Sequence, residues 1–119
     1  MDPKNLDVFK LSHQLTLRIY EITKTFPNEE KFGLTSQMRR SSSSIPMNIM
    51  EGAGRRTSRE YIHFLSICSG SCEEIKYQVL LSKDLGYIDL AVFSELTDEY
   101  TRVSKMLYRL LKSLQGKVQ

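Results

Sequence analysis

The sequence predicts an all-α protein, an antiparallel up-down four-helix bundle, from three observations. Four segments repeat apolar residues at the three- and four-residue steps of an amphipathic helix, the connections between them are short, and strand signals are absent. Short loops between amphipathic helices favour antiparallel neighbours in the fold. The length of 119 residues fits one domain, so we expect a single bundle over residues 1–119.

The first predicted helix spans residues 6–25 and ends before Pro27, and the second spans residues 34–53. The second contains Pro46, and proline disfavours a helix interior by about 3 kcal/mol. Apolar residues nevertheless keep helical spacing across the proline, namely Leu34, Met38, Ile45 and Ile49. We therefore expect one helix that bends near residues 42–46.

Capping signals define the third and fourth predicted helices. The third begins at Thr57, which forms a capping-box pair with Glu60, and it stops before Gly86, a residue suited to a helix end. The fourth begins at Asp89, a strong N-cap, and its apolar stripe continues to Leu114.

The positive charge is concentrated in one part of the chain. The formal net charge is only +3, but residues 31–60 carry six basic and two acidic groups. Five of the eight arginines form two clusters there: Arg39 and Arg40, then Arg55, Arg56 and Arg59. A local basic block of this kind indicates a polyanionic partner better than the overall charge does.

The sequence gives no sign of secretion or of a membrane span. The first residues, MDPKNLDVFK, lack a basic and apolar leader pattern, and no apolar stretch reaches 18 residues. Cys68 and Cys72 lie four residues apart in a helical pattern, where a disulfide has poor geometry. We expect a cytoplasmic protein that does not contact a membrane.

The segment RRSSSSIPMNIMEGAGR, which follows FGLTSQ and precedes a helix containing FLSICSGSCEE, carries a family resemblance. It resembles the signature of the four-helix-bundle proteins first known from reading frames inside 23S rRNA intervening sequences. The resemblance covers nearly the whole chain. It departs from the pattern at Ser41, Ser42 and Met50, where alanines are usual, which affects local packing alone.

The resemblance implies an antiparallel four-helix bundle that assembles into a ring, typically a pentamer. It also implies a relationship to the accessory subunit of diversity-generating retroelements, which binds a reverse transcriptase and nucleic acid through basic surface. For most members of the family the biochemical role is not established, so the family name gives a genomic location more than an activity.

Met47 and Met50 are the candidate residues for a subunit interface. At 100° per residue they point roughly opposite Ile45 and Ile49, so the second helix has apolar groups on two sides. Burial on both sides predicts contact with another copy of the chain. The alternative is that they are scattered surface methionines.

The two arginine clusters are expected to have different roles. In a continuous helix they lie about 24 Å apart, so one compact ligand cannot bridge both in one subunit. For Arg39 and Arg40 we favour structural ion pairs, within the chain or between subunits, for example Arg40 with Glu51, over phosphate contacts. Side chains at a loop and helix start are freer, and there the nucleic-acid candidates are Arg55, Arg56 and Arg59, with plain solvation as the alternative.

Several motif residues are expected to be structural. Asn48 and Glu51 suit a hydrogen-bond network or a helix-end contact, because an amide and a lone carboxylate define no reaction. Gly52 ends the second helix, and Gly70 is expected to let another helix approach closely. No second pair of cysteine or histidine residues completes a metal site with the two cysteines, so we expect no metal and no cofactor.

The sequence therefore favours a non-enzymatic homo-oligomer that binds RNA, or a nucleic-acid-processing protein, through its arginine-rich surface. One alternative is a purely structural or protein-binding ring. A more remote alternative is a helical ribonuclease of the HEPN type, in which Arg56 and His63 would assist cleavage at a 2′-hydroxyl.

Overall fold

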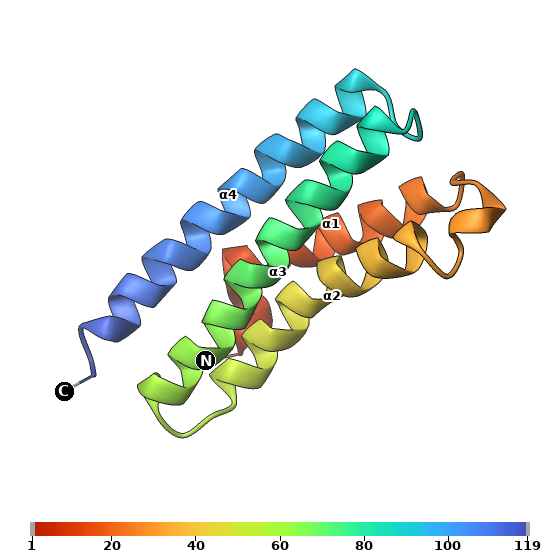
Figure 1. Cartoon of the computed structure of the whole chain (residues 1–119). Helices are drawn as coiled ribbons and strands as arrows, with labels where there is room; N and C mark the ends of the chain where they lie inside the picture. Colours follow the sequence, from red (N-terminus) through yellow and green to blue (C-terminus); the bar gives the residue numbers. More distant parts are fainter. Residues whose placement is uncertain (1, 119) are drawn as a thin grey trace.

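Four helices run antiparallel along a molecule that measures 48 × 24 × 21 Å (Figure 1). They are α1 (Asp7–Thr23), α2 (Leu34–Ala53), α3 (Ser58–Asp84) and α4 (Leu90–Gln115), and short 3-10 helices, η1 (Pro3–Asn5) and η2 (Asn28–Glu30), precede α1 and α2. This computed structural model describes residues 2–118, and none of these residues forms a strand. The predicted all-α up-down bundle is confirmed.

α3 lies at the centre of the packing. It packs against both α2 and α4, while α1 packs against α2 and more lightly against α4. The α2–α3 turn and both chain termini lie toward one end of the bundle, and the other two turns lie at the opposite end (Figure 1). The fully buried side chains of the core come from all four helices, and they include Ile19, Met38, Ile45, Ile49, Leu65, Ile75, Leu96 and Tyr100.

The helix ends follow the local capping signals. The Thr57 hydroxyl accepts the amide hydrogen of Glu60 at 3.1 Å, and the Asp89 carboxylate accepts that of Val92 at 2.9 Å. Gly86 has a φ of +81°, the left-handed conformation that a glycine adopts without strain at a helix C-terminus. The predicted ends of these helices are therefore confirmed.

The start of α2 is capped by a residue outside the helix. Its N-cap, Gly33, has no side chain, and the Glu30 carboxylate accepts the amide hydrogen of Leu34 at 3.2 Å instead. The other oxygen of the same carboxylate accepts the hydroxyl hydrogen of Tyr87 at 2.9 Å. One side chain therefore joins the α1–α2 turn to the α3–α4 turn.

Pro46 lies inside α2 without ending it. A proline has no amide hydrogen, so the carbonyl of Ser42, four residues earlier, lacks its usual helical donor. The Thr16 hydroxyl of α1 has one hydrogen, which it shares between that carbonyl at 3.1 Å and the carbonyl of Ser12 at 2.9 Å. A neighbouring helix thus supplies the donor that proline lacks. The continuity of α2 is confirmed, and its bend near residues 42–46 stays a prediction.

Candidate functional site

Three arginines lie at the α2–α3 turn, at the same end of the bundle as His63. Arg55 forms an ion pair with Glu51, one helical turn earlier, and its guanidinium lies 4.7 Å from the centre of the Phe64 ring. Arg56 and Arg59 are exposed, and neither side chain has a hydrogen bond or ion pair with any residue from 2 to 118. Two of the three arginine side chains are therefore exposed to solvent without a partner in the described chain.

A shallow depression lies beside this turn. Its lining residues are Arg55, Arg59, Glu60, His63 and Phe64. The exposed imidazole of His63 packs edge-on against Phe64, with 5.4 Å between the ring centres. Arg56 does not line this depression, and no hydrogen bond joins it to His63 within the described chain. The role of Arg56 and His63 in ribonuclease chemistry stays a prediction.

Arg39 is held by α1. Its Nε donates to the Thr23 hydroxyl at 2.9 Å, and its guanidinium lies 4.6 Å from the centre of the Tyr20 ring. The structural role that we favoured is therefore filled by a hydroxyl and an aromatic ring of α1, and the neighbouring carboxylate of Glu21 pairs with Lys24 instead. Within the chain, the predicted ion pair is wrong for Arg39.

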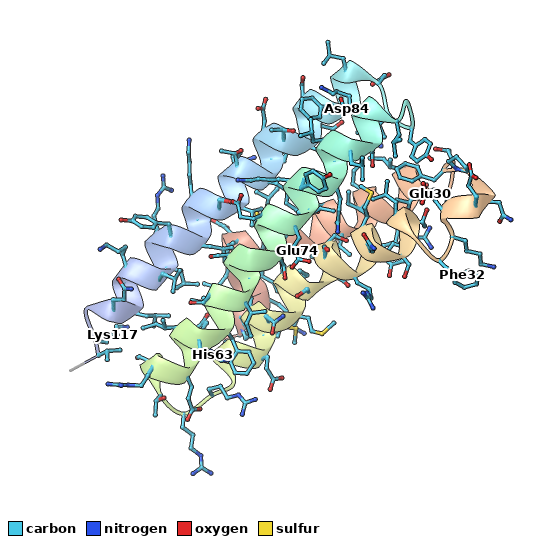
Figure 2. All side chains as sticks on the ribbon, in the orientation of Figure 1. Glu30, Phe32, His63, Glu74, Asp84 and Lys117 are labelled. Atoms are coloured by element: carbon cyan, nitrogen blue, oxygen red, sulfur yellow. The ribbon has the colours of Figure 1, made fainter. Side chains whose placement is uncertain are left out.

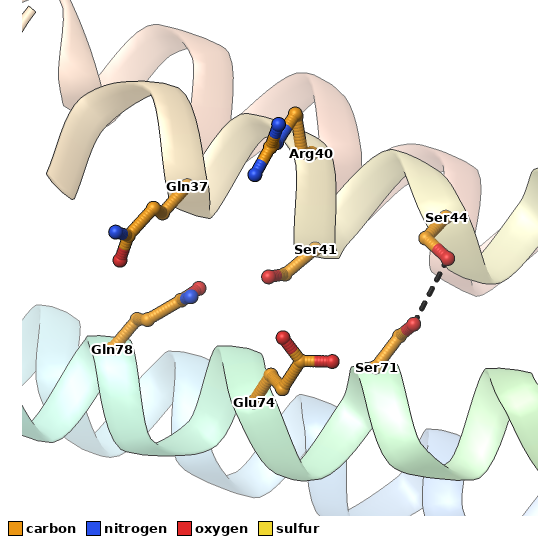
Figure 3. A pocket seen from close by; sticks show the side chains of 7 residues that line it. All are labelled: Gln37, Arg40, Ser41, Ser44, Ser71, Glu74 and Gln78. Carbon is orange, nitrogen blue, oxygen red and sulfur yellow. Dashed lines mark hydrogen bonds between the residues drawn. The ribbon is translucent and has the colours of Figure 1, made fainter. Parts of the chain in front are cut away.

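The predicted pair between Arg40 and Glu51 is also wrong. The two residues are eleven positions apart on α2, which corresponds to about 16 Å along the axis, whereas Arg55 is four positions from Glu51. Arg40 is exposed and lies instead at the rim of a groove between α2 and α3 (Figure 3). The residues that line this groove are Gln37, Arg40, Ser41, Ser44, Ser71, Glu74 and Gln78.

The groove is closed at one point by a hydrogen bond between helices. The hydroxyls of Ser44 and Ser71 lie 2.9 Å apart, as Figure 3 shows, and the Asn48 amide donates to the Ser44 hydroxyl at 3.0 Å. Asn48 therefore belongs to a short polar network, and Glu51 pairs with Arg55 at the end of α2. The Oε1 atom of Gln78 is buried and has no hydrogen-bond partner in the described chain.

The two motif glycines differ in their surroundings. A Cβ at Gly52 would lie 2.9 Å from Phe64 Cβ and from Tyr61 Cδ1, so this glycine allows α2 and α3 to approach closely. A Cβ at Gly70 would meet nothing within 4 Å. The prediction that Gly70 lets another helix of the bundle approach is therefore wrong, because α3 turns this position to the surface.

Met47 and Met50 are exposed, with 62% and 44% of their surface accessible. Their orientation away from the core of the chain follows the helical wheel of α2. Contact with a second copy stays a prediction.

Cys68 and Cys72 are free, fully buried thiols. Cys68 donates to the carbonyl of Ile45 on α2 at 3.3 Å, and Cys72 to that of Tyr100 on α4 at the same distance. Burial raises the pKa of Cys68 to about 12 and also raises the pKa of Cys72, so neither is a thiolate near neutral pH. Across residues 2–118 no three potential ligands cluster to hold a metal ion.

Charge is separated along α4 and the turn before it, a feature that the sequence-based predictions did not include. All five charged residues in the segment 84–99 are acidic, and all five in the segment 102–117 are basic. Figure 2 shows Lys117 and His63 at one end and Glu30 and Asp84 at the other. The signal for it in the sequence is a three-four-three spacing of basic residues in α4, formed by Arg102, Lys105, Arg109 and Lys112.

Comparison with known proteins decides the family. Residues 4–109 match the family described as 23S rRNA-intervening sequence protein. The chain belongs to this family.

A solved structure supports the assignment of the chain to this family. It is the 1.70 Å crystal structure of a protein of unknown function from the S23 ribosomal protein family of Bacteroides thetaiotaomicron VPI-5482. The two are 26% identical with a TM-score of 0.83, over 94% of this chain and 99% of that one. No curated protein matches the chain. In the part that the structure describes, no helix has the length and apolar character needed to span a membrane.

Proposed function

We propose that this 23S rRNA-intervening sequence protein is a non-enzymatic, self-associating module that binds RNA through the basic end of its bundle. The observation that carries the proposal is the arrangement at the α2–α3 turn. Arg56 and Arg59 are exposed without an internal partner, while Arg55 is oriented by Glu51 and Phe64. Guanidinium groups of this kind bind phosphate oxygens with paired hydrogen bonds.

The position of the turn strengthens the attraction for a polyanion. The basic segment 102–117 lies toward the same end of the bundle, whereas the acidic segment 84–99 begins at the other end. The summed field of such a distribution draws a polyanion to one end and repels it from the other.

Salt-dependent titration tests the proposal. We expect the affinity for structured RNA, measured by fluorescence anisotropy, to fall linearly with the logarithm of salt concentration. The double variant Arg56→Gln/Arg59→Gln should reduce the magnitude of that slope by about 1.4 to 1.8, because each phosphate contact contributes about 0.7 to 0.9. The matched control is Lys24→Gln/Lys31→Gln, which removes the same charge from exposed lysines toward the other end.

Two results would refute RNA binding at this turn. One is absent or salt-insensitive binding by the unaltered protein. The other is an equal loss of affinity in the two double variants, which would show that only net charge matters.

Self-association is the basis of the second candidate, a structural or protein-binding ring without nucleic acid. The exposed Met47 and Met50 on α2 favour it, because an apolar pair on an otherwise polar face suits a contact between copies. We expect Met47→Asp or Met50→Asp to dissociate the assembly, measured as a lower mass by light scattering. Unchanged mass in both variants would remove the interface from this face of α2.

A further inference from the structure

The outer face of the second half of α4 is a second basic surface, separate from the α2–α3 turn. Lys105, Arg109 and Lys112 are all exposed there and lie within about 11 Å along the helix axis. We call these three residues, together with Tyr108, the α4 platform. Its neighbour along the helix, Arg102, is different because its guanidinium is bonded to both oxygens of Glu99 at 3.1 Å.

These cations form few interactions that stabilise the fold of the chain. Among residues 2–118, the side chains of Lys105 and Arg109 have no hydrogen-bond or ion-pair partner. The helix dipole favours positive charge only within the last turn, which includes Lys112 but neither of the other two. Stabilisation of the monomer therefore does not account for this concentration of charge.

Tyr108 lies among the cations with 61% of its surface exposed. It lines a shallow surface depression together with Thr101, Ser104, Lys105 and Arg109. The ammonium group of Lys112 lies 5.8 Å from the centre of its ring, on the edge of cation–π distance. An exposed aromatic face surrounded by cations combines the two features that bind a nucleic-acid strand, namely base stacking and phosphate attraction.

We propose that the α4 platform binds unpaired RNA, with one base stacked on Tyr108 and the neighbouring phosphates held by Lys105, Arg109 and Lys112. The proposal rests on the proposed RNA-binding function and adds the class of ligand. Only an unstacked base can lie flat against a tyrosine, so the platform selects single-stranded loops or ends over a duplex. On the N-terminal side of Thr101 the charged residues of α4 are acidic. They repel phosphates, so the bound strand turns away from the helix at this point.

The test compares Tyr108→Ala with Tyr108→Phe for binding of an RNA strand of about 16 nucleotides, free and annealed to its complement. Tyr108→Ala should weaken binding of the free strand about 5- to 150-fold, with an unchanged salt slope because no charge is lost. Tyr108→Phe should bind as the unaltered protein does, since it keeps the ring. The triple variant Lys105→Gln/Arg109→Gln/Lys112→Gln should reduce the slope by about 2.

The outcomes separate this inference from the function on which it rests. If Arg56→Gln/Arg59→Gln weakens binding while Tyr108→Ala and the triple variant do not, the platform is refuted and RNA binding at the turn stands. If the unaltered protein binds no RNA, both fall. If the triple variant lowers the mass of the assembly and leaves RNA affinity unchanged, the face contacts the acidic half of another copy, and the platform is refuted.

Discussion

The hydrogen bond from Thr16 to the carbonyl of Ser42 predicts an energetic coupling between Thr16 and Pro46. Thr16→Val keeps the shape of the side chain but removes the only donor that, among residues 2–118, reaches this carbonyl from outside α2. Ser42 is fully buried, so its carbonyl cannot turn to water. An unsatisfied buried polar group costs about 1–3 kcal/mol, and we expect the free energy of unfolding to fall by that amount.

Pro46→Ala supplies the control. An alanine has an amide hydrogen that can bond to the Ser42 carbonyl within the helix, so Thr16→Val should cost less than about 0.5 kcal/mol in that background. The coupling energy of the cycle is the difference between these two losses, about 0.5–3 kcal/mol, and over most of that range it exceeds the additivity error of about 0.5 kcal/mol for independent sites. Urea unfolding at a fixed protein concentration measures it, because self-association would otherwise change the apparent stability.

Additivity of the two substitutions within about 0.5 kcal/mol would refute the reasoning. So would a loss in Thr16→Val that Thr16→Ser reproduces in full. The serine keeps the hydroxyl, so an equal loss would assign the effect to the missing methyl group rather than to the hydrogen bond.

Three further predictions concern the core and the contact between helices. Gly52→Ala should lower the unfolding free energy by about 1–3 kcal/mol in urea because its Cβ enters the α2–α3 contact, whereas Gly70→Ala, open in the monomer, should leave it unchanged or higher. Tyr100→Phe should leave the free energy of unfolding unchanged or raise it, since the buried hydroxyl has no partner in the described chain. A fall in that free energy of more than about 1 kcal/mol would show that the hydroxyl makes a hydrogen bond after all. Because burial raises the folded-state pKa of Cys68 to about 12, above the unfolded value of about 8.5, its contribution to stability is complete below pH 8.5 and is lost as the pH rises towards 12. Cys68→Ala should flatten the decline of unfolding free energy in that range, and an unchanged decline would contradict the assignment.

The elements of the fold could be predicted because their signals are local. Thr57, Gly86 and Asp89 each act on backbone groups within a few residues, so their roles were readable without knowing what packs against them. The apolar spacing across Pro46 likewise indicated that α2 continues. The donor that makes this tolerable, Thr16, lies 26 positions from Ser42 in sequence and depends on how α1 crosses α2.

The contacts of the candidate site were harder to predict from the sequence, because the partner of a charged group depends on distances in the folded structure. The pairing of Arg55 with Glu51 follows from a four-residue step and could have been expected. The contact of Arg39 with Thr23 could not, since it requires the packed position of α1. The charge of α4 was missed for another reason: opposite signs in its two halves cancel in a sum, although they lie at different ends of the molecule.

The two buried thiols lie at different helix contacts, which can therefore be observed separately. Cys68 faces the backbone of α2, and Cys72 faces that of α4, although both belong to α3. A thiol reagent reaches the first only when α2 separates from α3 and the second only when α4 does. The relative labelling rates of the two cysteines therefore report whether the bundle opens as one cooperative unit or one helix at a time.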